Sequence, residues 1–123
     1  MHSDIDLEMT SLGDFIIGNI DNQPDPRLEK IKSVLDHVIE TRISENIMGS
    51  LFSKLIINSC ITSLGAVCGL YLGEMLSIKK ARDIFLSVME EAMEEAMAVD
   101  LHVAVFAGKL DYYSFCRGRG DLL

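Results

Sequence analysis

The stretch Leu55–Gly73 carries no charged side chain, and it constrains the fold more than any other segment. Its many Leu, Ile and Val side chains favour burial, because apolar surface left in water is costly. The stretch is also long enough to cross a bilayer as a helix. Asn58 and Thr62 dilute its apolar character and Glu74 bounds it, which favours a buried helix pair in a water-soluble core. A membrane span is the alternative.

Small residues recur within this stretch at four-residue spacing, at Gly65, Gly69 and Gly73. Such spacing is typical of helices that pack closely, and it is best known from membrane helix dimers. Small residues serve equally well for tight helix packing in water. We therefore expect a close helix contact here.

Helical periodicity on both sides of this stretch predicts a mainly α fold. Asp25 and Pro26 form a helix start, with an acidic N-cap and proline at the first helical position, and the helix is expected over Pro26–Val38. Ser44 is expected to cap a second helix that runs to about Cys60. Further helices are expected over Leu64–Leu76 and Ile78–Val99, and a short one within Phe106–Leu123.

The helix expected over Ile78–Val99 is amphipathic, with a run of glutamates between Glu90 and Glu95 opposite an apolar stripe. Methionines at helical spacing more often fill a core than bind a ligand. The stripe expected to face the core is Phe85, Val88, Met89, Ala92, Met93, Ala96 and Met97.

The first part of the chain reads as extended rather than helical. Asp4–Met9 alternates polar and apolar residues, and Phe15–Ile20 is β-branched and aromatic, with Gly13 and Asp14 in the turn between them. We expect a short β-hairpin. Residues 39–43 are expected to form a connector or a single strand. The prolines of the turn at 21–26 place a domain boundary between residues 23 and 24.

Charge and cysteine content exclude several classes of function. The chain has 19 acidic and 11 basic residues and a net charge of −8, which argues against nucleic-acid and anionic-membrane partners. Cys60, Cys68 and Cys116 form no CxxC pair, which fits a reducing compartment. The histidines form no metal-ligand spacing, so no metal is expected. No secretory signal opens the chain, and the cytoplasm is the expected location.

Lys54 and Asn58 are the best candidates for chemistry. They stand four residues apart on an expected helix and therefore share one face. A lysine beside apolar neighbours is often only a surface residue whose stem covers apolar side chains. The alternative is a proton donor, since partial desolvation lowers the pKa of an ammonium group. An amide one turn further along would orient a polar substrate beside it.

The segment Phe52-Ser53-Lys54-Leu55-Ile56-Ile57-Asn58, continued through Gly73-Glu74-Met75, resembles the ketopantoate reductases (2-dehydropantoate 2-reductases). Gly13-Asp14-Phe15-Ile16-Ile17-Gly18 is similar to the last strand of that family's Rossmann domain. The resemblance covers most of residues 13–115. It implies a multi-helix substrate and dimerisation domain of the 6-phosphogluconate-dehydrogenase C-terminal type over residues 24–123, incomplete at its end. Residues 1–23 would be a β-hairpin remnant of the Rossmann domain.

The resemblance also implies an activity. The family reduces a 2-keto acid with NADPH, in the biosynthesis of pantothenate, and a Rossmann domain holds the cofactor. Lys54 matches the family's lysine, which donates a proton to the keto oxygen as hydride reaches the carbon, and Asn58 matches its first substrate-binding asparagine. Thr62 stands where the family has a second substrate-binding asparagine, and Leu72 replaces a further one, so another 2-keto acid is an open alternative.

This sequence contains no GxGxxG, so no cofactor is expected to bind these residues alone and the isolated chain is expected to be inactive. A missing Rossmann domain is therefore one expected partner. A non-catalytic helical module that associates with itself is the competing hypothesis. Apolar helix faces left without a partner lead us to expect a homo-oligomer in either case.

Overall fold

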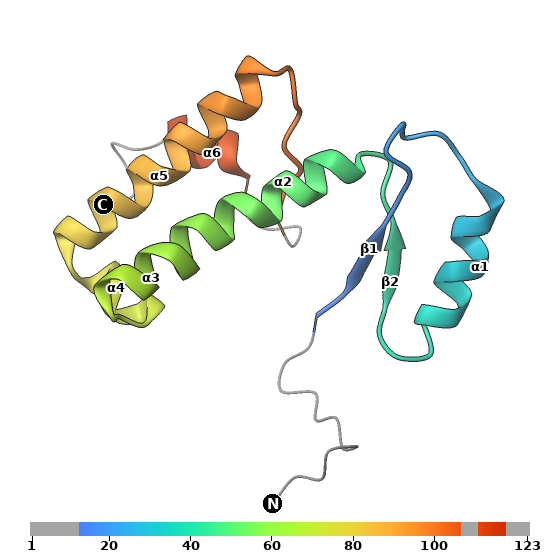
Figure 1. Ribbon diagram of the computed structural model, residues 1–123, viewed down its shortest axis with the longest axis horizontal. Helices are drawn as coiled ribbons and strands as arrows, with labels where there is room; N and C mark the ends of the chain where they lie inside the picture. The colour runs from blue at the N-terminus through green and yellow to red at the C-terminus, as the bar shows by residue number, and fades with distance from the viewer. Residues whose placement is uncertain (1–12, 107–110, 118–123) are drawn as a thin grey trace, which may run out of the picture. The chain divides into compact units, whose positions relative to one another are not determined.

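The computed structural model describes residues 13–106 and 111–117. The chain divides into two compact units, Met1–Glu45 and Asn46–Leu123. The described residues are mostly helical, with one short pair of strands before the second unit (Figure 1), which confirms the predicted fold class. The strand expected over Asp4–Met9 lies outside the described residues. A domain boundary after residue 23 stays a prediction.

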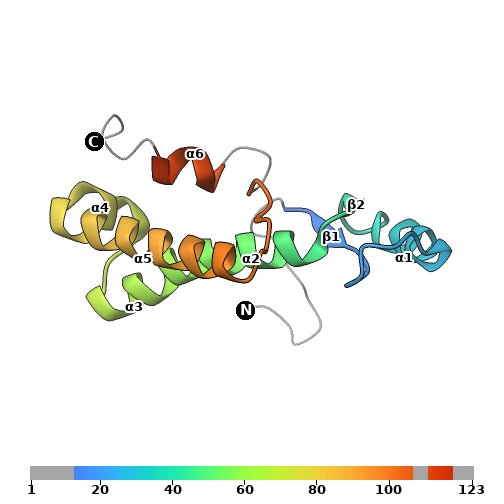
Figure 2. The ribbon, with the colours of Figure 1, turned by 90° about the horizontal axis from the view of Figure 1, so that it is seen from above.

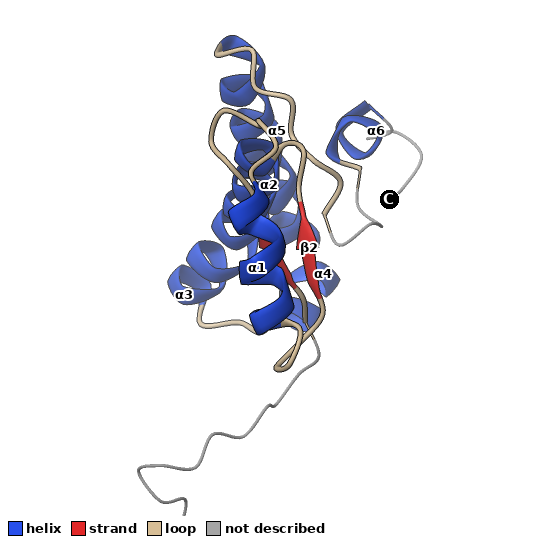
Figure 3. Cartoon of the chain, turned by 90° about the vertical axis from the view of Figure 1, so that its right-hand side faces the viewer, coloured by secondary structure: helices blue, strands red, loops and turns tan. Residues whose placement is uncertain are grey.

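The first unit is a strand, a helix and a second strand: β1 (Phe15–Ile17), α1 (Pro26–Leu35) and β2 (Thr41–Ile43). The strands pair in parallel (Figure 1), with Phe15 opposite Thr41. Figure 3 shows β2 beside α1. We expected β1 to pair with the preceding segment Asp4–Met9 in a hairpin. In the described residues it pairs with the later strand β2. The reason is the crossover through α1, which brings the chain back in the same direction.

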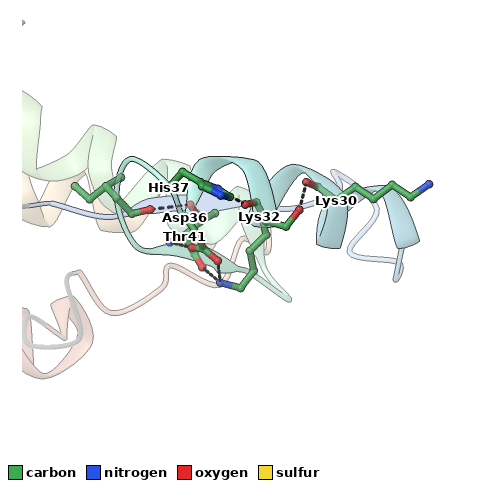
Figure 4. A network of polar contacts seen from close by, with 7 residues as sticks. Lys30, Lys32, Asp36, His37 and Thr41 are labelled. Atoms are coloured by element: carbon green, nitrogen blue, oxygen red, sulfur yellow. Dashed lines mark hydrogen bonds and ion pairs between the residues drawn. The ribbon is translucent and has the colours of Figure 1, made fainter.

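Helix α1 begins as predicted, because the Asp25 carboxylate accepts the Arg27 backbone N–H at 2.8 Å. At its other end, Asp36 accepts the Thr41 backbone N–H at 2.8 Å, and the Lys32 ammonium lies 2.7 Å from Asp36 and 2.6 Å from the Thr41 carbonyl (Figure 4). The Lys32 hydrogen bond, followed by that of Thr41, holds the pKa of Asp36 below its usual value. This network fixes the buried Thr41 at the start of β2.

The second unit is helical, and two of its helices, α2 (Ile47–Asn58) and α5 (Lys79–Ala98), lie side by side (Figures 1 and 2). Between them the chain forms the π-helix η1 (Ser59–Ser63) and the short helices α3 (Leu64–Cys68) and α4 (Leu72–Ser77), and α6 (Tyr112–Arg117) packs on α5. The largest side chains of the core are Ile56, Ile57, Met75, Phe85, Leu86, Met89, Met93 and Tyr112.

The apolar stripe predicted for α5 is the face that enters the core. Phe85, Met89, Met93 and Ala96 are buried, and Val88 and Ala92 pack against them. Met97 is 55% exposed, so the prediction was wrong at that position. The buried stripe ends at Ala96, one residue earlier than expected and close to the end of α5 at Ala98.

The helix expected over Leu64–Leu76 is interrupted by Gly69, which ends α3 in the left-handed region at φ 65°. Glycine adopts that backbone conformation at little cost. A Cβ at Gly69 or Gly73 would meet no atom within 4 Å. At these two positions, therefore, the glycines do not mediate the close helix contact that we expected. Gly69 instead ends α3.

One helical stretch of the described residues, Ile47–Cys68, is long and apolar enough to cross a membrane by length and composition alone. A core helix of a water-soluble protein passes the same test. The side of this stretch that carries Ile56, Ile57 and Cys60 packs into the core with α5. Packing within the chain therefore explains the apolar character of that side.

The start of α2 is fixed by Asn46 rather than by the predicted Ser44. The Asn46 side chain accepts the Gly49 backbone N–H at 3.0 Å and donates to the His102 carbonyl at 2.7 Å. Ala104 N–H donates to the Gly49 carbonyl at 3.2 Å. The chain that follows α5 thus returns along the first turn of α2, where a Cβ at Gly49 would lie 2.2 Å from both the His102 oxygen and the Asn46 amide.

We predict that Gly49→Ala destabilises the protein by about 1–3 kcal/mol, because the His102 backbone and the Asn46 cap must move to admit the methyl group. Gly73→Ala is the matched control, since its Cβ enters open space and alanine favours a helix. Urea unfolding followed by circular dichroism measures both. Equal stability of the two variants would contradict the close approach at Gly49.

Candidate functional site

Three polar side chains lie along one exposed side of α2 and η1. Lys54 stands in α2, Asn58 is its last residue, and Thr62 follows in η1, each four residues after the one before. All three are exposed, whereas Ile56, Ile57 and Cys60 on the other side are buried. The structure therefore brings the three predicted site residues together on one side of a continuous helical stretch.

The π-helix η1 brings Thr62 closer to alignment with Lys54 and Asn58. In a regular α-helix, a residue eight positions after Lys54 would be rotated by about 80° from it. A π turn holds more residues than an α turn, so each residue turns the chain less. Because Thr62 lies within η1, it stays closer to the line of Lys54 and Asn58 than α-helical geometry would allow.

Lys54 has an aromatic neighbour from a distant part of the chain. Its Nζ lies 5.4 Å from the centroid of the Phe106 ring, within the range of a cation–π contact. Phe106 belongs to the segment that returns from α5 and is packed against the core. Phe106 could not be identified from the sequence, because it lies 52 positions after Lys54 and nothing in the local pattern links the two residues.

A second aromatic residue fixes the helical turn that carries Lys54. The Tyr112 hydroxyl donates to the Ser53 carbonyl at 2.7 Å. Burial raises the pKa of the Tyr112 hydroxyl, so it remains a donor at neutral pH. Ser53 itself is buried. Helix α6 thus anchors the residue next to Lys54, a role that sequence reasoning also missed.

The chemistry open to this site is limited by what surrounds it. Burial, with a smaller effect of the nearby Cys116, raises the pKa of the Cys60 thiol to about 11, so Cys60 is not a nucleophile at neutral pH. Among residues 13–106 and 111–117, no group of three or more His, Cys, Asp or Glu side chains is placed to hold a metal ion. An ammonium, an amide and a hydroxyl suit a small, oxygen-rich anion.

The start of α1 does not fit the phosphates of a dinucleotide. A helix N-terminus binds phosphate through free backbone N–H groups, but Pro26 lacks one and the Asp25 carboxylate already accepts that of Arg27. A pocket of about 360 Å³ beside this helix start is lined by the acidic residues Asp25, Glu29 and Glu45 among others. These carboxylates would repel a phosphate group.

Comparison with known proteins gives one family. The family described as ketopantoate reductase PanE/ApbA, C terminal, matches residues 46–112, which is more than half of the chain. The match begins at the first residue of the second compact unit and contains all three site residues. No curated protein and no solved structure gives a significant match.

The burial of Cys60 makes a direct prediction. Iodoacetamide at neutral pH should modify the exposed Cys68 much faster than Cys60, because only the thiolate reacts and Cys60 is both protonated and enclosed. Tandem mass spectrometry of the tryptic peptide Leu55–Lys79, whose fragment ions distinguish the two cysteines, measures both rates over time. Modification of Cys60 at the rate of Cys68 in the folded chain would contradict the packing of η1.

Proposed function

The chain belongs to the ketopantoate reductase C-terminal family, and from that premise we propose that it is the helical substrate domain of an NADPH-dependent 2-keto-acid reductase. The observation that carries the proposal is the exposed row of Lys54, Asn58 and Thr62 within the matched residues. The family places this chain among the oxidoreductases. The roles proposed for the three residues are those that the family resemblance implies.

Lys54 is the proton donor in this proposal. Reduction of a ketone turns the carbonyl carbon into an alcohol carbon and places negative charge on the oxygen, which then takes up a proton. An ammonium group stabilises that charge as it develops and supplies the proton from Nζ. The contact with Phe106 supports the assignment, because it gives the ammonium a defined place on the helix.

Asn58 and Thr62 hold the substrate's other oxygens. An amide offers two N–H donors and one acceptor, and a hydroxyl offers one donor and two lone pairs, so together they suit a carboxylate or a hydroxyl group. Thr62 has the smaller hydrogen-bonding capacity, and Leu72 contributes no polar atom from its side chain. We propose ketopantoate as the substrate and keep a 2-keto acid with fewer polar groups as the alternative.

The cofactor would be held by another domain. The start of α1 is unsuited to phosphate, and the sequence contains no GxGxxG, so we propose that a Rossmann domain supplies the NADPH site. The chain alone is then inactive. Three cysteines without a CxxC pair agree with a cytoplasmic location. The acidic balance gives no support to a nucleic-acid partner.

A non-catalytic module that associates with itself is the second candidate, and exposed apolar side chains favour it. Leu51 is 56%, Leu55 54% and Val67 84% exposed in the single chain. Surfaces of this kind are usually covered by a partner. Leu51 and Leu55 flank Lys54, so a Rossmann domain that closes over the substrate would also cover them.

Binding of ketopantoate to the purified chain tests the proposal. We expect Lys54→Ala to weaken binding at least about tenfold, because a charge-assisted hydrogen bond is lost. Lys80→Ala, which removes an exposed lysine from α5, should leave the affinity unchanged. Isothermal titration calorimetry measures the three affinities. An equal loss of affinity in both variants would mean that Lys54 acts only through the net charge of the chain and does not contact the ligand.

Turnover gives the second part of the same test. The chain mixed with NADPH and ketopantoate should consume no NADPH, and turnover by the chain alone would contradict the two-domain proposal. Together with the Rossmann domain, Lys54→Ala should lower kcat by about 10²–10⁴-fold, as expected for loss of a general acid. An unchanged kcat would exclude Lys54 as the proton donor.

Light scattering separates the states of association. We expect the chain to form a dimer or a larger assembly, because the apolar side chains of α2 and α3 are uncovered in the single chain. Val67→Ser should shift the assembly towards monomer if that face is the contact. A monodisperse monomer of the unaltered chain at micromolar concentration would contradict self-association.

A further inference from the structure

The segment that carries Phe106 is fixed to the protein independently of Lys54. Asn46 donates to the His102 carbonyl, Ala104 donates to the Gly49 carbonyl, and the Val103 N–H donates to the Tyr113 hydroxyl at 3.0 Å. Val103 is buried in the core. These contacts fix the backbone as far as Ala104, and the Phe106 side chain itself packs against the core. The ring therefore has support that does not depend on Lys54.

Among the residues that the structure describes, none forms a hydrogen bond or an ion pair with the Lys54 side chain. It is exposed on α2, and a lysine side chain has four rotatable bonds to a strongly hydrated ammonium. On an open helix surface such a side chain samples many rotamers, which lowers the fraction of time in any reactive geometry. The face of an aromatic ring attracts a cation through its quadrupole, and the observed separation of 5.4 Å lies within range.

We propose that Phe106 is a positioning residue that holds the Lys54 ammonium in place on the α2 surface. Phe106 acts through Lys54 and does not contact the reacting atoms. Its importance for catalysis rests on the proposed function, in which Lys54 delivers the proton. The placement of the ammonium itself rests only on the geometry of the described residues.

Nuclear magnetic resonance of the full chain with ¹³C-labelled lysine tests the placement directly. Protons above an aromatic ring shift upfield, so the Lys54 ε-methylene signal, identified by its loss in Lys54→Arg, should lie upfield of the other lysines. Phe106→Leu should abolish this displacement, because it keeps an apolar side chain and removes the ring. Phe106→Tyr should retain it, and Lys80 provides the reference signal of an exposed lysine.

Two results of the lysine spectra would contradict the placement of Lys54 by Phe106. A Lys54 signal that coincides with Lys80 in the unaltered chain, or that is unchanged in Phe106→Leu, overturns the inference. Phe106→Met serves as a second ring-free variant if the leucine variant does not fold, as judged from its amide spectrum. The observation in the unaltered chain requires no variant of Phe106 at all.

Ketopantoate added to the same samples distinguishes this inference from the proposed function. If both hold, Phe106→Leu weakens ketopantoate binding and Phe106→Tyr restores it, which a purely structural role of the side chain would not predict. An upfield Lys54 signal without ketopantoate binding contradicts the proposed function and supports the placement by Phe106. Ketopantoate binding that Phe106→Leu leaves unchanged overturns the positioning role.

Discussion

The architecture of the second unit depends on the return of the chain along α2 after α5 ends. One amide side chain, Asn46, both caps α2 and donates to the His102 carbonyl, and the absence of a side chain at Gly49 lets the two backbones approach. From this point the returning chain reaches Phe106, and α6 then places Tyr112 against the Ser53 carbonyl. The turn of α2 that carries Lys54 is thereby contacted from outside its own helix.

The division of α2 into two sides explains how one helix serves both the core and the site. The buried side supplies Ile56 and Ile57 to the core shared with α5, and rigid packing there fixes the orientation of the opposite side. That opposite side carries Lys54 and Asn58, exposed and one turn apart. The π-helix after Asn58 keeps Thr62 near the same line, a placement that an uninterrupted α-helix would not give.

Local patterns predicted the elements of the fold better than their contacts. The start of α1 at Asp25 and Pro26 and the core side of α5 follow from capping chemistry and helical periodicity, which act over a few residues. The parallel pairing of β1 with β2 depends on tertiary structure. The cap at Asn46 and the break at Gly69 each fall on one of several neighbouring residues that could serve, so the local pattern does not single them out. Phe106 and Tyr112 reach Lys54 and Ser53 only through the fold, so no spacing in the sequence indicates them.

The central claim is that Lys54 and Asn58 contact a 2-keto acid. Isotope-filtered nuclear Overhauser spectroscopy on the chain with ketopantoate tests it most directly, because it reports which protons lie near the ligand's methyl groups. The account predicts contacts to the Lys54 side chain and to the Asn58 side-chain amide. Contacts confined to another surface of the chain, or none at a saturating concentration of ketopantoate, would contradict it.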